Sequence, residues 1–125
     1  MISITFKQMI KQNNKELKMK KVKIAKTIEK FIKKYDVHRD VRIYFSNKCW
    51  DYDSNGNKTI INNIKASDYF EYANNETISM SFEGRLYDVI NSYYSSTIRD
   101  AWDELDFDGY YYELGHSWNL SFYKA

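Results

Sequence analysis

The stretch that decides the fold is VRIYFS, residues 41–46. Apolar and polar side chains alternate along it, with Val41, Ile43 and Phe45 set against Arg42 and Tyr44. This two-residue period is typical of a strand that is buried on one face. KTIINNI, residues 58–64, has the composition of a partner strand. We therefore predict an antiparallel hairpin.

The connection between these two segments contains DYDSNGN, residues 51–57, which begins like a calcium-binding loop. Oxygen-bearing side chains stand at loop positions one, three and five and a glycine at position six: Asp51, Asp53, Asn55 and Gly56. Such a loop also needs an apolar residue at position eight and a glutamate at position twelve, and here these are Lys58 and Asn62. We predict a hairpin turn and no metal site, because Asn-Gly favours the positive φ that hairpin turns require.

Three further segments alternate in the same way. They are TISMSF (77–82), YYYEL (110–114) and WNLSFY (118–123, with Trp118, Leu120 and Phe122 inward). Short connections between such strands predict a largely antiparallel sheet of about five strands. The last two should pair through Gly115-His116.

Residues 17–35 have the helical period. One arc of the helix carries the apolar residues Leu17, Ile24, Ala25, Ile28, Phe31, Ile32 and Tyr35. The opposite face carries Lys23, Lys26, Lys30, Lys33 and Lys34. We predict an amphipathic helix whose apolar side faces the core. ISITFKQMI, residues 2–10, fits a strand or a helix.

Shorter helices are predicted between the strands. The first, SDYFEYA (67–73), is short. The second, RLYDVINSYY (85–94), has an apolar side made of Leu86, Val89, Ile90 and Tyr93. The third, TIRDAWDELDF (97–107), has an apolar side made of Ile98, Ala101, Trp102 and Leu105. In the last one Thr97 and Asp100 have the spacing of a capping box, and Gly109 is the expected stop. The chain is therefore an α+β domain with an N-terminal helix and further short helices packed on one sheet face.

Composition limits the class of protein. The 125 residues make one domain of modest size, and an aromatic content of 18% excludes a disordered tail. The single Cys49 cannot form an internal disulfide, which favours a reducing compartment. Lysines interrupt every hydrophobic stretch, so no signal peptide or membrane-spanning segment is predicted. We expect a cytoplasmic protein of a bacterial host cell, without membrane contact.

Charge is distributed unevenly about the net value of +2. Residues 1–35 hold eleven lysines against two glutamates, a net charge of +9, and residues 36–125 carry a net charge of −7. A basic arm on an acidic body is the expected layout.

Translation could also begin at Met19. The codons of Lys15-Glu16 can read as a ribosome-binding sequence a few bases upstream of it. We therefore divide the chain into residues 1–18, a leader or flexible arm, and residues 19–125, the α+β domain.

Catalytic chemistry has little support in the sequence. His38, His116 and Cys49 have no metal-ligand spacing, and the four glycines form no phosphate-binding cluster. Acidic residues at 100–108 could include a catalytic pair, which leaves a hydrolase or nuclease as a third hypothesis. We expect a protein that is not an enzyme and has no cofactor.

The five lysines of the helix have two interpretations. Each could neutralise about one phosphate of a nucleic acid, with strong salt dependence and little sequence preference because the helix has no arginine. They could equally form a solvated face.

RDAWDELDFDGYYYE, residues 99–113, is the stretch on which the functional hypothesis rests. Negative charge crowds the predicted C-terminal end of a helix, where the macrodipole disfavours it, without visible compensation. The predicted binding surface consists of these carboxylates and the tyrosines that follow: Asp100, Asp103, Glu104, Asp106, Asp108, Tyr110, Tyr111 and Tyr112. At most alternate tyrosines can face the core. A solubilising acidic face beside a buried aromatic strand is the other interpretation.

Two segments, ISMSFEGRLYDVIN (78–91) and YYELGHSWNLSFY (111–123), resemble small proteins of phages and mobile elements in low-GC Gram-positive bacteria. Some proteins of that setting are anti-CRISPRs, which block the RNA-guided nuclease of type II systems by protein–protein contact. The resemblance implies an anti-defence inhibitor and a nuclease as protein partner, and it assigns no residue. The leading hypothesis is a binding protein whose acidic, tyrosine-rich surface occupies a basic groove. The alternative is a small nucleic-acid-binding or regulatory protein that uses the lysine-rich helix, residues 20–34.

Overall fold

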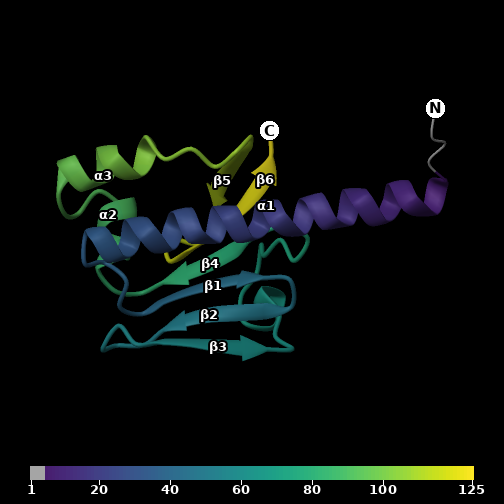
Figure 1. Cartoon of the computed structure of the whole chain (residues 1–125). Coiled ribbons are helices and arrows are strands. Elements are labelled where there is room, and N and C mark those ends of the chain that lie inside the picture. The colour runs from purple at the N-terminus through teal and green to yellow at the C-terminus, as the bar shows by residue number, and fades with distance from the viewer. Residues whose placement is uncertain (1–4) are drawn as a thin grey trace.

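The computed structural model describes residues 5–125. A long helix comes first, and strands and short helices follow it (Figure 1). The elements are α1 (Phe6–Lys34), β1 (Val41–Phe45), β2 (Lys48–Tyr52), β3 (Lys58–Asn62), the 3-10 helix η1 (Ala66–Asp68), β4 (Ser79–Phe82), α2 (Arg85–Ile90), α3 (Ser96–Asp103), β5 (Tyr110–Leu114) and β6 (Asn119–Lys124).

The strands form one sheet in the order β3-β2-β1-β4-β6-β5, and every neighbouring pair is antiparallel. The predicted α+β class is confirmed. The sheet has six strands instead of the five predicted, because β2 was missed.

The missed strand follows a two-residue turn. Ser46 and Asn47 have φ values of 52° and 58°, the backbone of the tight turns that join antiparallel strands. The chain reverses there, so that β2 pairs with β1, and Val41 lies opposite Tyr52. Ser-Asn is a weaker turn signal than Asn-Gly, and the reversal was therefore not predicted.

DYDSNGN is a hairpin turn, as predicted, but it joins β2 to β3 and not β1 to β3. Asp53 organises it: its Oδ1 accepts the backbone N–H of Asn55 (2.8 Å) and of Asn57 (2.9 Å). Gly56 has a φ of 84°, which glycine adopts without strain. The carboxylate that would stand at the third position of a calcium loop is thus used to fold the turn.

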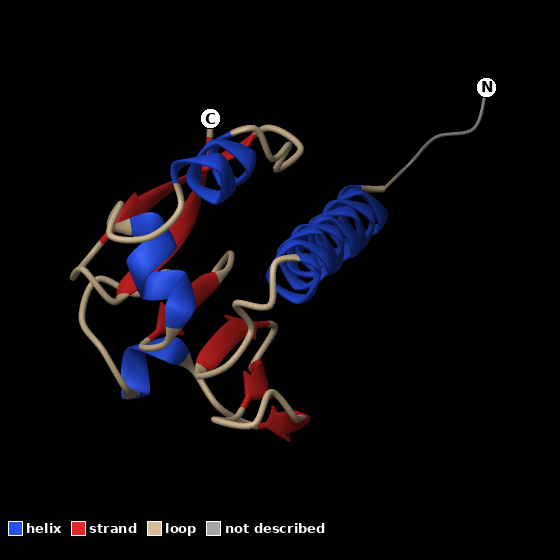
Figure 2. Ribbon diagram, turned by 90° about the vertical axis from the view of Figure 1, so that its left-hand side faces the viewer, coloured by secondary structure: helices blue, strands red, loops and turns tan. Residues whose placement is uncertain are grey.

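The first helix is longer than predicted. Thr5 and Gln8 form a capping box, and α1 then runs without a break for 29 residues, about 43 Å. Its C-terminal half packs on the sheet, whereas its N-terminal half extends beyond it (Figures 1 and 2). All its buried residues lie in the C-terminal half, as predicted: Ile24, Ala25, Ile28, Phe31 and Ile32.

The short helices differ from the prediction at their ends. Residues 67–73 hold only the last two residues of the 3-10 turn η1. α2 stops at Ile90, which leaves Tyr93 exposed and not in the core. Ser95 caps α3 by accepting the N–H of Ile98, so the predicted Thr97 capping box is wrong. Gly109, at a φ of 84°, lies in the turn before β5 and does not end α3.

One core cluster fills the space between α1 and the sheet. It takes inward residues from β1, β2, β4 and β6 and is extended by Leu86 and Val89 of α2 and Trp102 of α3. All three α-helices therefore contribute to the same cluster. Trp102 is fully buried and makes an edge contact with Phe31, 5.2 Å between ring centroids.

A polar contact ties α1 to the β2–β3 hairpin. The Glu29 carboxylate accepts hydrogen bonds from the Tyr52 hydroxyl and from Lys58 Nζ (2.6 Å), and that ammonium lies 3.7 Å from the Trp50 ring centroid. Burial acts to raise the pKa of Glu29, but the hydrogen bonds from Lys58 and Tyr52 outweigh it, so its pKa lies below the ordinary glutamate value. Burial, with the negative charge of Glu29 beside it, raises the pKa of Tyr52.

The other face of the sheet is covered only in part. Ile64, Ala66 and Phe70 of the segment after β3 pack on Tyr44 and Cys49 in a second, smaller cluster. That segment leaves the neighbouring row of side chains open.

We predict that deleting residues 1–18 leaves the domain folded. No side chain removed is buried among those the structure describes, so the melting temperature should change by at most about 3 °C. Circular dichroism melts of the two chains measure this. A deletion of residues 1–28, which removes three buried side chains, is the control and should abolish the cooperative transition.

We predict that Glu29→Gln lowers the free energy of unfolding by about 1–2 kcal/mol at pH 7, because the charge-assisted bonds to Lys58 and Tyr52 are weakened. The pKa of Glu29 is lower in the folded chain than in the unfolded chain. Its contribution is therefore complete at neutral pH and is lost as the pH falls through and below the ordinary glutamate range. Urea titrations should show the two proteins converging in acid, and a pH-independent difference would contradict this.

Candidate functional site

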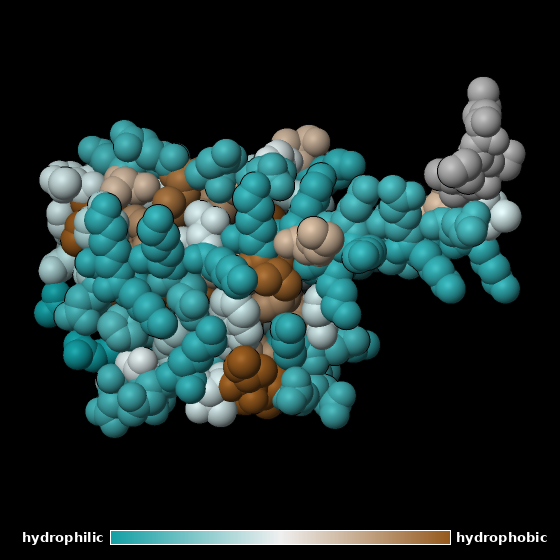
Figure 3. Space-filling model, viewed as in Figure 1, coloured by the Kyte–Doolittle hydropathy of each residue, from teal (hydrophilic) through white to brown (hydrophobic). Residues whose placement is uncertain are grey.

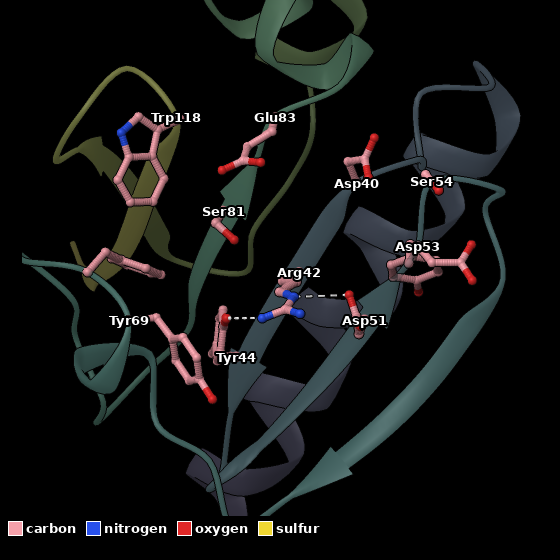
Figure 4. Close-up of a pocket in the computed structure, with 12 residues that line it drawn as sticks. Asp40, Arg42, Tyr44, Asp51, Asp53, Ser54, Tyr69, Ser81, Glu83 and Trp118 are labelled. Atoms are coloured by element: carbon pink, nitrogen blue, oxygen red, sulfur yellow. Dashed lines mark hydrogen bonds and ion pairs between the residues drawn. The ribbon is translucent and has the colours of Figure 1, made fainter.

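A cleft of about 510 Å³ opens on the sheet face opposite α1 (Figure 4). Its floor is a row of side chains from three neighbouring strands. Strand register sets Arg42 of β1 opposite Asp51 of β2 on one side and Ser81 of β4 on the other. Because alternate residues of a strand share a face, all three point away from the core.

Three carboxylates continue the same face at the strand ends. The backbone N–H of Asp40 donates to Asp53 O, and the N–H of Glu83 donates to Asp40 O, both at 3.1 Å. These bonds hold Asp53, Asp40 and Glu83 side by side along the rim of the cleft (Figure 4). Neighbouring strands are about 4.8 Å apart, and like charges at that spacing destabilise a sheet.

Close backbone packing fixes this arrangement. Asp40 has a left-handed φ of 58°, a conformation that aspartate tolerates better than most residues. A Cβ added at Gly84 would lie 2.5 Å from the carbonyl oxygen of Arg39. Position 84 therefore needs a glycine for the residues after β4 to approach those before β1.

Arg42 is already neutralised. Its Nε donates to Asp51 Oδ1 at 3.1 Å and its Nη1 to the Tyr44 hydroxyl at 3.5 Å. The hydrogen bond to Tyr44, together with the charge of Asp51, raises the pKa of Arg42 above its usual value. Within residues 5–125, Asp40, Asp53 and Glu83 make no ion pair. The cleft is therefore anionic.

Aromatic rings form the opposite wall. Tyr69, Phe70 and Trp118 line the cleft, and Tyr69 is 56% exposed. Phe70 makes an edge contact with Trp118, with 5.7 Å between ring centroids, and Tyr69 packs against Tyr44, with 5.9 Å between ring centroids. The site thus places aromatic rings beside the carboxylates of Asp40 and Glu83, which make no ion pair within residues 5–125, and of Asp53, whose Oδ1 is used in its own turn. This combination suits an organic cation.

The structure divides the set of residues predicted to bind a partner. α3 ends at Asp103, and Asp106 and Asp108 lie in the connection between α3 and β5. Arg99 Nε contacts both carboxylate oxygens of Asp103 at 3.1 and 3.2 Å, and Lys23 lies 3.9 Å from Asp108. The premise that these charges lack compensation is therefore wrong for Asp103 and Asp108. Asp100 and Glu104 are exposed.

The tyrosines do not share one surface with those carboxylates. Tyr110 and Tyr112 are half-buried against the main core, where Trp102 Nε1 donates to the Tyr112 hydroxyl at 3.1 Å. Tyr111, on the other face of β5, is 45% exposed beside Tyr123. We predicted that alternate tyrosines of this strand would point to opposite faces. Tyr111 is therefore separated from the face on which α3 packs.

The five predicted lysines of α1 all lie exposed: Lys23, Lys26, Lys30, Lys33 and Lys34. Their binding to nucleic acid stays a prediction.

The sequence reasoning missed the cleft. Its carboxylates are 13 and 30 residues apart along the chain, counting from Asp40 to Asp53 and from Asp53 to Glu83. Only the pairing of β1 with both β2 and β4 brings them together. DYD at 51–53 was a usable signal, because two carboxylates at alternate positions share a face of a strand.

No family model, curated protein or solved structure significantly matches this chain. The resemblance to anti-CRISPR proteins is therefore unsupported by these comparisons. Within residues 5–125, no helix has both the length and the apolar character needed to cross a membrane. In the same range no three His, Cys, Asp or Glu side chains are grouped so that they could hold a metal ion.

We predict that neither calcium nor magnesium binds the cleft with useful affinity. Its rim carboxylates stand in a row set by strand spacing, whereas a cation needs oxygens converging to about 2.0–2.6 Å. Isothermal titration should show no saturable heat below the millimolar range. Saturable binding that Asp53→Asn abolishes would contradict the prediction.

Proposed function

We propose that this chain is a non-enzymatic binding protein whose acidic cleft accepts a lysine or arginine side chain of a protein partner. One observation carries the proposal: the carboxylates of Asp40, Asp53 and Glu83 make no ion pair within residues 5–125 and line a cleft that also has an aromatic wall. Such a row of like charges weakens the sheet, and a cation from outside would relieve the repulsion.

The chemistry of the cleft matches a basic side chain better than a metal ion or an anion. A guanidinium has several N–H donors, which can reach more than one carboxylate, and its planar face can stack on Tyr69 or Trp118. The Arg42–Asp51 pair on the floor adds no net charge. A cleft of about 510 Å³ has room for one or two side chains, so the remaining contact area must come from the surface around it.

An acidic cleft of this kind requires a protein partner with a basic surface. An RNA-guided nuclease of a type II system, which has a basic nucleic-acid groove, is the particular partner we propose, on the strength of the sequence resemblance alone. The cleft replaces the end of α3 as the main acidic surface of this hypothesis, because Asp103 and Asp108 have internal partners.

The cleft itself can be tested without a known partner. We predict that N-acetyl-arginine amide, titrated to the millimolar range, shifts the indole N–H resonance of Trp118 but not that of the fully buried Trp102. Acetyl-norleucine amide, which lacks the charge, should leave both unchanged. Asp40→Asn with Glu83→Gln should abolish the shift and hold or raise the melting temperature, because like-charge repulsion falls.

A matched control removes two acidic charges elsewhere. Asp103→Asn with Glu104→Gln changes the net charge equally and should leave the Trp118 shift intact. The same proteins can then be used to capture a purified type II nuclease or proteins from a bacterial lysate. Loss of capture in the α3 variant but not in the cleft variant would refute the cleft and restore the end of α3 as the binding surface.

A further inference from the structure

A second concave surface runs along α1, on the side of the molecule away from the cleft. It is shallow and open to solvent, with a volume of about 750 Å³, and all its lining residues belong to α1, between Lys15 and Lys30. They recur at helical spacing, so they form one face of the helix. In the space-filling view, hydrophilic side chains stand along α1 and a small apolar patch is exposed among them (Figure 3).

The groove has an apolar floor and a basic rim. Met19 is 63% exposed and Val22 is half-buried. Around them stand five lysines: Lys15, Lys18, Lys23, Lys26 and Lys30. Their methylene stems extend the apolar area, and their ammonium groups remain at the edge. Only Lys23 has an internal carboxylate nearby, Asp108 at 3.9 Å, among residues 5–125.

We infer that this groove is a docking site for an acidic amphipathic helix of a protein partner. Charge complementarity points to this occupant: the rim would pair with its carboxylates, and its apolar residues would cover Met19 and Val22. Amphipathic helices bind hydrophobic grooves in this way, and methionine adapts its shape to varied apolar surfaces. The inference does not depend on the acidic cleft, which lies on the opposite face of the sheet.

A nucleic acid fits the groove less well. Phosphates would pair with the lysines, but nothing in a nucleic-acid backbone would cover the exposed methionine. A protein helix uses both the apolar floor and the basic rim.

The test uses the full chain and a synthetic peptide of about 18 residues, long enough to form helix. It contains glutamate, alanine and leucine, with leucines on one face. Saturable binding should appear by fluorescence anisotropy and should shift the methyl resonance of Met19 but not that of the buried Met80. A peptide of the same composition with scattered leucines should bind at least about tenfold more weakly.

Variants of the helix separate the possible occupants. Lys26→Glu with Lys30→Glu should weaken peptide binding about tenfold or more, and Met19→Ser should weaken it severalfold. Lys33→Glu with Lys34→Glu is the matched control, because these exposed lysines lie outside the groove, and it should have little effect. Circular dichroism confirms that each variant keeps its helix.

Three results would overturn the inference. The first is the absence of saturable binding at low salt, or equal binding of both peptides. The second is tight binding of a DNA duplex of about 20 base pairs, if the two double lysine variants weaken that binding equally and Met19→Ser does not weaken it. That result would assign the surface to nucleic acid. The third is a dimer in sedimentation that Lys26→Glu with Lys30→Glu dissociates, which would assign it to a second copy of the chain.

Discussion

The packing of α1 across the sheet is the interaction on which the rest of the structure depends. Ile24, Ile28, Phe31 and Ile32 are buried against the inward residues of β1, β2, β4 and β6, at about 1.5–3 kcal/mol for each side chain. Glu29 adds a polar contact that sets the hairpin of β2 and β3 against the helix. Without α1, the part of this sheet face that α2 and α3 do not cover would lie open to water.

Covering that face determines where binding surfaces can lie. On the second face, the segment after β3 covers Tyr44 and Cys49 and stops short of Arg42, so the acidic cleft opens beside it. Burial raises the pKa of Cys49 to about 12, which keeps this thiol protonated and unreactive beneath that segment. On the side of the sheet that α1 covers, the outer face of α1 stays exposed, because only its inner face packs in the core.

The two proposed sites have opposite charge and lie on opposite sides of the molecule. The asymmetry in the sequence, +9 against −7, therefore becomes a spatial separation: lysines along α1 and carboxylates at the ends of β1, β2 and β4. Each surface pairs charge with apolar or aromatic contact, which gives a partner both orientation and buried area. A partner could engage either side without competing for the other.

The sequence by itself determined the elements that depend on local periodicity. The amphipathic helix, five of the six strands, the Asn-Gly turn and the alternation of the tyrosines in β5 all follow from residue spacing. Only the tertiary structure decided the features that depend on contacts between segments. The chain reversal at Ser46-Asn47 is specified by the pairing of β1 with β2 and not by composition. The row Asp53–Asp40–Glu83 exists only when three strands lie in register. Likewise, Lys23 of α1 reaches Asp108 only in the folded chain, because these two residues are far apart along the sequence. The pairing of Arg99 with Asp103, four residues apart on one helix, could have been predicted from their spacing.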